Sequence, residues 1–408
     1  MEQGKTNRYD FIDIGKALCI IGVVFYHLVV GTVIRRTGTP ELTPGSPVEW
    51  AFRNANFLNF ILPFFFFATA FTYKRGVRPV KETISRRLKT LVLPFIVIFI
   101  LTIFLSSLYF WAFKGQRFTS VLAKGFLFFA WGGHYFPVEI PAIDLFANAS
   151  GKILVINDFL GPFWYIQVLI PASIAFYPIV EYFNEEKMGR NYHIYRGLLV
   201  IVLLALTCIE PLVTVWHLPF GLGRAPFALL AMVVGYWLKE AGLYSLKKIW
   251  VRIIVFLVAG VVVYLTGYYT GGTIIYARSE YGGRGILSIL LCYLNTIAGT
   301  IVWVEICKLI ALIKTKWIRK IFINLGQNSF AVYAFHMVVG EYLRSLIMLI
   351  PGNPITATMD NTGIQMAIQG VISIATIVIS YYGGKALLVL INKLLAIKKK
   401  PKQENPVT

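Results

Sequence analysis

The chain has 408 residues, of which 57% are hydrophobic, 15% aromatic and only 14% charged, whereas an ordinary soluble domain has about 25% charged residues. So few charged side chains cannot cover the surface of a water-soluble globule of this size, so the composition indicates a polytopic membrane protein. The formal net charge of +20 would suggest a nucleic-acid partner, unless the basic residues follow the topology of a membrane protein instead.

Ten apolar segments are long enough to cross a bilayer as helices, which takes about 20 residues each. They are residues 11–33, 56–73, 90–112, 160–182, 197–216, 222–238, 253–270, 285–312, 328–350 and 365–392. The stretch 119–136 is a candidate for an additional re-entrant or interfacial helix. The polar arm before the first segment carries both signs of charge, and no small-residue cleavage site follows it, so we expect no cleaved signal peptide.

The basic residues orient these segments. With the N-terminus inside, the cytoplasmic segments hold 25 Lys and Arg, whereas the opposite loops hold nine and the spans hold five. This bias is a strong positive-inside signal, so both termini are predicted to be cytoplasmic. Most of the net charge is therefore topological, and we expect no nucleic-acid partner.

The ten spans use nearly the whole chain. Residues 1–397 are predicted to form a single transmembrane unit, and residues 398–408 a basic, polar cytoplasmic tail. No internal repeat of helices is visible, and the long external segment 113–159 is expected to be an ordered loop. The four cysteines lie in apolar stretches without metal-ligand spacing, so we expect buried hydrophobic side chains and no metal site.

The first span carries three ionisable side chains, which are expensive inside a membrane and therefore candidates for function. Lys16 and His27 are 11 residues apart, so they face the same direction with an axial separation of about 16 Å. Asp13 lies one turn from Lys16, where the two can pair. The structural alternative is that Asp13 and Lys16 anchor the helix at the interface and His27 bonds a neighbouring helix.

A second polar stripe lies in the ninth span, in NSFAVYAFHMVVG. Ser329, Tyr333 and His336 share one helix face, which Gly340 continues by allowing close backbone approach. His336 lies about 10 Å along the helix from Ser329. Polar contacts between helices explain this stripe as well as a site does.

Three further arginines and one tryptophan lie at the ends of spans. Arg86 and Arg87 precede the third span, where they could hold an anion such as a nucleotide phosphate, although orientation alone explains most of this basic cluster. Arg224, Arg284 and Trp164 lie at external ends, where snorkelling and an aromatic belt are the structural alternatives.

Together these residues resemble a known family. The order Asp13, Lys16, ten residues and His27, followed by SRRLKTLVLPF, GPFWYIQ, RAPFALLAMVVGYWL and NSFAVYAFH, is similar to membrane-bound acyltransferase family three. The similarity is to its polysaccharide O-acetylase type, which includes fucose 4-O-acetylase-like proteins, and it covers essentially all ten spans. One departure is Lys16, where the family usually has Arg; lysine keeps the charge but loses the bidentate fork.

The resemblance implies an O-acyltransferase of the cell membrane that moves an acetyl group from cytoplasmic acetyl-CoA to a hydroxyl of an extracytoplasmic carbohydrate. Its helices would surround a tunnel shared by CoA and the acceptor. The implied catalytic residues are His27, Asp13 and His336; the implied CoA-binding residues are Lys16, Arg86, Arg87, Ser329 and Tyr333; and the implied acceptor-binding residues are Trp164, Arg224 and Arg284. His27 acts either as general base or as acyl carrier, and the base is favoured because the thioester itself can reach it.

Two other classes of protein stay open at this point. A transporter or flippase of a glycan or acylated precursor shares the spans and the buried charges, but needs no catalytic histidine. A non-catalytic membrane component would recruit glycan-assembly proteins, which are also candidate partners of an enzyme. The sequence contains no recognisable code for the acceptor sugar.

Overall fold

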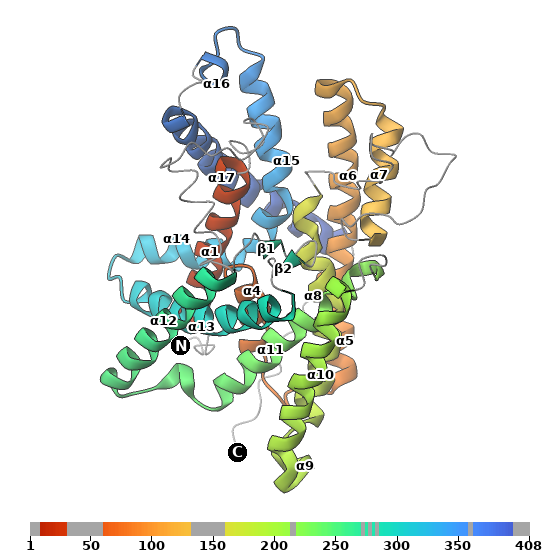
Figure 1. Cartoon of the computed structure of the whole chain (residues 1–408). Coiled ribbons are helices and arrows are strands. Elements are labelled where there is room, and N and C mark those ends of the chain that lie inside the picture. The colour runs from red at the N-terminus through yellow and green to blue at the C-terminus, as the bar shows by residue number, and fades with distance from the viewer. Residues whose placement is uncertain are drawn as a thin grey trace, which may run out of the picture.

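The computed structural model describes residues 9–30, 60–131, 160–212, 218–270, 274–275, 280–281, 285–357 and 362–394. Within these ranges the regular structure is helical (Figure 1), apart from the two-residue strands β1 (Ile274–Ile275) and β2 (Glu280–Tyr281), which pair antiparallel. The all-α prediction is therefore confirmed for the described part of the chain.

The elements follow one another closely along the chain. In the N-terminal half they are α1 (Asp10–Phe25), η1 (Tyr26–Val30), α4 (Pro63–Phe71), α5 (Val80–Arg87), η3 (Leu88–Val92), α6 (Leu93–Lys114), α7 (Phe118–Trp131), η4 (Gly161–Phe163), α8 (Trp164–Tyr182), α9 (Glu185–Met188), η5 (Gly189–Asn191) and α10 (Tyr192–Leu212). In the C-terminal half the helices are η6 (Pro219–Gly221), α11 (Ala225–Glu240), η7 (Leu243–Ser245), α12 (Ile249–Thr270), α13 (Ile286–Ala311), α14 (Lys316–Gln327), α15 (Ser329–Met348), α16 (Pro354–Ala357) and α17 (Thr362–Leu394).

Eight helical segments of the described chain are long and apolar enough to cross a membrane. They are Asp10–Val29, Val80–Lys114, Trp164–Tyr182, Glu185–Ile209, Pro219–Glu240, Ile249–Thr270, Ile286–Ala311 and Gly363–Ile391. The protein is therefore a multi-pass membrane protein. The other two predicted spans are not among them, because α4 has nine residues and α15, with 20, contains Glu341 and Arg344. The count of ten stays a prediction.

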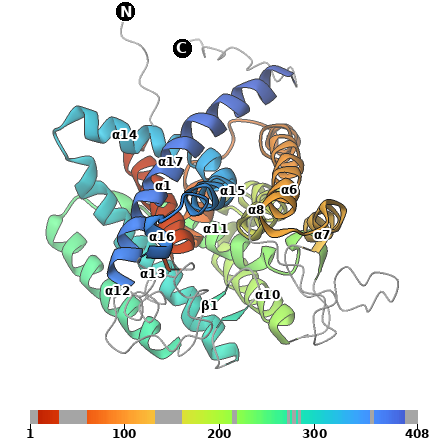
Figure 2. The same cartoon turned by 90° about the horizontal axis from the view of Figure 1, so that it is seen from above.

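The first helix is the centre of the packing. In α1, nine of 16 residues are buried, and the helix contacts α4, α13, α14, α15 and α17. Figure 2 shows α1 and α15 near the middle of the molecule, with α7 and α12 at opposite edges. The outer helix α12 leaves large apolar side chains such as Leu257, Val261 and Tyr268 exposed, as expected for a face that contacts lipid.

Two segments differ from simple predictions of loops. The stretch 119–136 contains a helix, α7, which packs along α6. Residues 314–320, expected to connect two spans, instead begin the amphipathic helix α14, which lies against α1. Gly326 of α14 makes this contact close, because a Cβ atom there would lie 1.8 Å from the carbonyl oxygen of Asp13.

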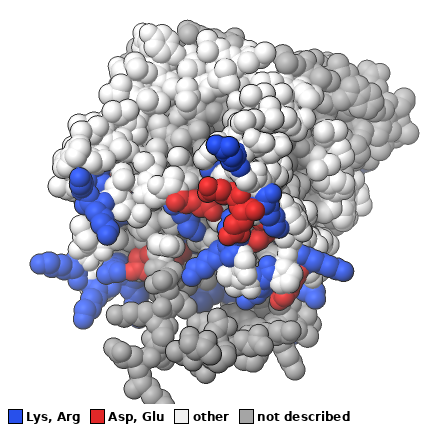
Figure 3. All heavy atoms as spheres, turned by 90° about the horizontal axis from the view of Figure 1, so that it is seen from below, with Lys and Arg blue, Asp and Glu red and all other residues white. Residues whose placement is uncertain are grey.

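Charged side chains gather at one end of the molecule. Figure 3 shows that Lys and Arg side chains, with a smaller group of Asp and Glu, lie on the face seen from below. Lys81, Arg86, Lys316 and Arg319 of α5 and α14 are all exposed. In the predicted topology, α5 and α14 belong to the cytoplasmic side.

Candidate functional site

A cavity of about 470 Å³ lies where several helices begin or end. Its walls come from the first turns of α1 and α15, the last turns of α4, α5 and α14, the turn η3, and the length of α8. Along α8 it extends from Tyr165 to Tyr177, 12 residues that span about 18 Å of helix. Except for the start of α8, these helix ends belong to the predicted cytoplasmic side, so the cavity leads from that side into the membrane domain.

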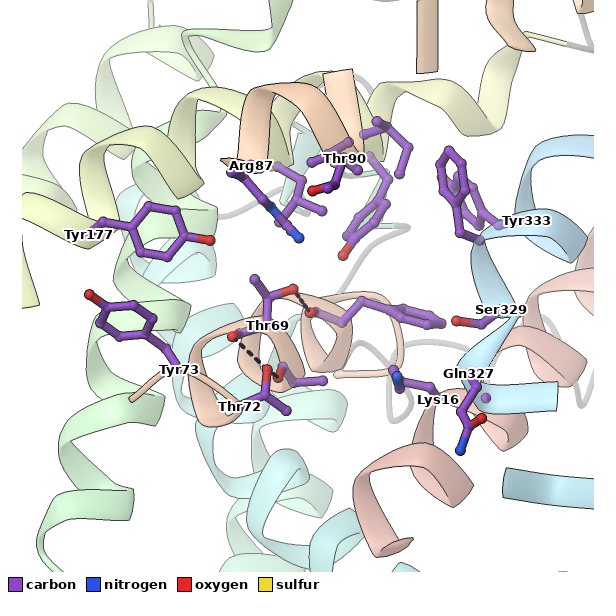
Figure 4. A pocket seen from close by; sticks show the side chains of 18 residues that line it. Lys16, Thr69, Thr72, Tyr73, Arg87, Thr90, Tyr177, Gln327, Ser329 and Tyr333 are labelled. Atoms are coloured by element: carbon purple, nitrogen blue, oxygen red, sulfur yellow. Dashed lines mark hydrogen bonds between the residues drawn. The ribbon is translucent and has the colours of Figure 1, made fainter. Parts of the chain in front are cut away.

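Two cations face this cavity (Figure 4). Lys16 enters from α1 and Arg87 from α5. Lys16 forms the ion pair that the spacing predicts, with its Nζ 2.8 Å from Oδ1 of Asp13. Arg87 has no carboxylate within ion-pair distance among the described residues, and its buried Nε has no hydrogen-bond partner there. Arg87 is therefore a cation available to an anionic ligand.

Of the five predicted CoA-binding residues, four line this cavity: Lys16, Arg87, Ser329 and Tyr333. Arg86 does not; its side chain is exposed. The sequence offered no means of choosing between these adjacent arginines. The helix itself decides, because successive residues point about 100° apart.

A π-helical turn follows each of the helices that carry the two cations. The turn η3 comes directly after Arg87 and places Thr90 and Leu91 in the cavity wall. The turn η1 carries His27 at the end of α1. Such turns are rare and are frequently found at functional sites.

The histidines of the first and ninth predicted spans lie side by side. The ring centroids of His27 and His336 are 5.4 Å apart, and His336 is completely buried. The helices approach closely here: a Cβ atom on Gly340 would lie 2.6 Å from Leu28. The spacing argument placed these two side chains on separate stripes, and the structure joins the stripes.

The hydrogen bonding of His336 determines which nitrogen carries the proton. Its Nδ1 lies 2.8 Å from the carbonyl oxygen of Tyr333, and a carbonyl only accepts, so Nδ1 donates. In the neutral ring Nε2 is then an acceptor, and it is buried without a hydrogen-bond partner among the described residues. This is an unsatisfied acceptor next to His27, in surroundings where such a group is costly.

Tyr333 connects the cavity to the histidine pair. Its ring lines the cavity and lies 6.0 Å from the ring of His336. Its hydroxyl donates to the carbonyl of Pro162, immediately before α8. Neither His27 nor His336 is part of the cavity wall, so the histidines lie one layer beyond its inner end.

Asp13 is not brought to the histidines. It is buried beside Lys16, and 14 residues of the same helical segment separate it from His27, an axial distance of about 21 Å. Its observed contacts orient Lys16, and Gln327 also approaches its carboxylate.

The predicted acceptor residues meet at the start of α8. Arg224 is 2% exposed and Trp164 8%, and the guanidinium carbon of Arg224 lies 5.9 Å from the indole centroid. The backbone before Arg224 is unusual: Phe220 has a φ of 54°, a region non-glycine residues rarely adopt. Trp164 directly precedes Tyr165 of the cavity wall. Arg284 lies outside the described residues.

Sequence reasoning missed two groups of residues. The first is the tyrosine pair Tyr73 and Tyr177 at the outer end of the cavity (Figure 4), for which the sequence carries no signal. The second is a buried polar face on α17, formed by Gln365, Gln369, Ser373, Thr376 and Ser380. Their spacing of three or four residues would have revealed the second group.

Among the described residues, no group of three His, Cys, Asp or Glu side chains could hold a metal ion. Cys19, Cys292 and Cys307 are buried, and Cys208 is partly buried.

Comparison with known proteins gives one finding. A family model described as an acyltransferase domain matches residues 9–384. No curated protein and no solved structure gives a significant match. The matched region contains the cavity, both histidines and the Trp164–Arg224 pair. Because the match covers almost the whole chain, the protein belongs to acyltransferase family 3.

Proposed function

We propose that the protein transfers an acetyl group from cytoplasmic acetyl-CoA to a hydroxyl of an extracytoplasmic carbohydrate, with His27 as general base. The observation that carries the proposal is the histidine pair at the inner end of a cationic cavity. His27 and His336 lie 5.4 Å apart, and Tyr333 joins them to the cavity that holds Lys16 and Arg87.

The cavity suits the donor. CoA carries phosphates at one end and the thioester at the other, so its site needs cations near the aqueous side and a path toward the reacting groups. Arg87 offers a guanidinium without an ion-pair partner among the described residues, which matches phosphate geometry bidentately. Lys16, held by Asp13, adds a second positive charge. In this proposal Arg86 only contributes to the positive surface.

The histidines suit the chemistry. The acceptor hydroxyl oxygen attacks the thioester carbonyl carbon while a neutral His27 nitrogen takes its proton. The tetrahedral intermediate then collapses with cleavage of the carbon–sulfur bond, and the CoA thiolate leaves and takes a proton from the His27 imidazolium. The net products are the acetyl ester and CoA thiol. His336 keeps Nε2 unprotonated through its bond to Tyr333, so it can accept a hydrogen bond from His27 or the acceptor hydroxyl.

The acceptor would approach from the other side. Trp164 offers an apolar face for a sugar ring, and Arg224 offers donors for its oxygens. Both lie at the start of α8, next to the Tyr165 that ends the donor cavity. This places the hydroxyl and the thioester on opposite sides of the same short segment. We place the protein in the cell membrane with both termini inside, with the glycan, the lipid and glycan-assembly proteins as partners.

The proposal is tested with purified protein in lipid nanodiscs, measuring CoA release from acetyl-CoA with and without an acceptor glycan. His27→Ala should abolish transfer at unchanged protein yield, because no base then takes the proton. His193→Ala is the matched control, since His193 is exposed at the start of α10 and should keep wild-type activity. Full activity of His27→Ala would remove His27 from the mechanism, whereas glycan movement across a membrane without thioester loss would favour a transporter.

A further inference from the structure

The outer end of the donor cavity has a chemical character of its own. Tyr73, just after α4, and Tyr177, near the end of α8, both line the cavity there. Their ring centroids are 5.1 Å apart at an interplanar angle of 47°. Figure 4 shows this pair at the end of the cavity opposite Ser329, Lys16 and Tyr333.

The tyrosine pair is held in place from outside the cavity. The hydroxyl of Tyr73 donates to a carboxylate oxygen of Glu181, which also accepts from the backbone N–H of Gly76. Lys239 donates to the carbonyl oxygen of Tyr73, 2.9 Å away. Tyr177 is 6% exposed. An aromatic surface held this firmly loses little conformational freedom when a flat ligand binds.

The order of groups along the cavity matches the order of groups along a nucleotide-bearing donor. The tyrosines lie at the outer end, Arg87 lies between the ends, and Tyr333 and Tyr165 lie at the inner end beside His336. We propose that Tyr73 and Tyr177 form a purine-binding subsite that stacks the base of the donor nucleotide, while Arg87 binds an adjacent phosphate. The donor then lies along α8 with its acyl end toward the histidines.

This inference rests on the proposed function for the identity of the donor, but its main test does not require turnover. Equilibrium binding of adenosine 3′,5′-bisphosphate, the nucleotide half of CoA, is measured for the purified protein in nanodiscs. Tyr177→Ala should weaken binding about tenfold or more, as loss of base–aromatic stacking does elsewhere. Tyr177→Phe, which keeps the ring, should bind within about twofold of wild type.

Two further variants separate stacking from folding. Tyr182→Ala makes the same change on the same helix at a residue that is 52% exposed and outside the cavity wall, and should bind like wild type. Tyr177→Leu fills the volume without an aromatic face and should bind as weakly as Tyr177→Ala. Wild-type affinity in Tyr177→Leu, or no nucleotide binding by the wild-type protein, would overturn the subsite.

A kinetic comparison distinguishes failure of the subsite from failure of the proposed function. Tyr177→Ala should raise KM for acetyl-CoA about tenfold and leave KM for S-acetylpantetheine, which lacks the nucleotide, unchanged. An equal rise with both donors would overturn the subsite and leave the proposed function standing. Nucleotide binding with the expected variant pattern, but no acetyl transfer from either donor, would overturn the proposed function and leave the subsite standing.

Discussion

The contact between α14 and α1 is a sensitive point of the fold, and Gly326→Ala tests it. A Cβ atom at this position would lie 1.8 Å from the carbonyl oxygen of Asp13, 2.6 Å from its carbonyl carbon and 3.0 Å from its Cα. All three atoms are backbone, so no side chain can rotate away. The two helices must separate by roughly 1.5 Å to restore van der Waals contact.

This separation should cost about 3 kcal/mol, at the upper end of typical overpacking penalties. It should also shift Lys16 and Ser329 on the cavity wall, so nucleotide affinity should fall together with stability. The assay is the midpoint of thermal unfolding in detergent, with adenosine 3′,5′-bisphosphate binding measured on the same sample. Gly260→Ala is the control, because a Cβ atom on that α12 residue has nothing within 4 Å. An unchanged midpoint for Gly326→Ala would refute the packing of α14 on α1.

Two further predictions concern charged residues. Arg87→Gln should raise KM for acetyl-CoA about tenfold with little change in kcat, because a charge-assisted phosphate contact is worth about 1.5–3 kcal/mol; Arg86→Gln should stay within about twofold, and equal effects of the two would contradict the assignment. Glu305→Gln should lower stability by about 2 kcal/mol without changing KM, because the Glu305 carboxylate bonds both Arg252 and Lys308 and its loss leaves two partly buried cations unpaired. Thermal unfolding checks the second prediction, and a normal midpoint would show that water satisfies these cations.

The helical architecture was predictable because a bilayer leaves few options. Long apolar segments must be helices, and the described helices fall on the predicted segments, as α13 (Ile286–Ala311) does on 285–312. The boundaries that moved are those of polar helices: α5 and α14 are charged, and hydropathy reads such segments as loops. Their helical form follows from amphipathic packing against neighbours, which only the assembled fold supplies.

Part of the candidate site was predictable for the same reason. The 11-residue spacing of Lys16 and His27 fixes a shared direction along one helix, and the spacing of Ser329, Tyr333 and His336 does so along another. Nothing in the sequence states that the two stripes face each other. That meeting depends on helix packing.

The tyrosine pair lay beyond sequence reasoning altogether. Tyr73 and Tyr177 are separated by more than a hundred residues, and tyrosine is common at membrane interfaces, where it needs no ligand to explain it. Only their joint presence in one cavity wall distinguishes them. The choice of Arg87 over Arg86 likewise required the three-dimensional direction of each side chain.

The central claim is that His27, beside His336, drives acetyl transfer to an extracytoplasmic glycan. The most direct measurement is the content of ester-linked acetyl groups on the surface glycans of a deletion strain that expresses either the wild-type protein or His27→Ala at equal abundance. The account predicts that the wild-type protein restores the acetyl esters and that His27→Ala leaves the glycan as bare as in the deletion strain. Restoration of the acetyl esters by His27→Ala would contradict it.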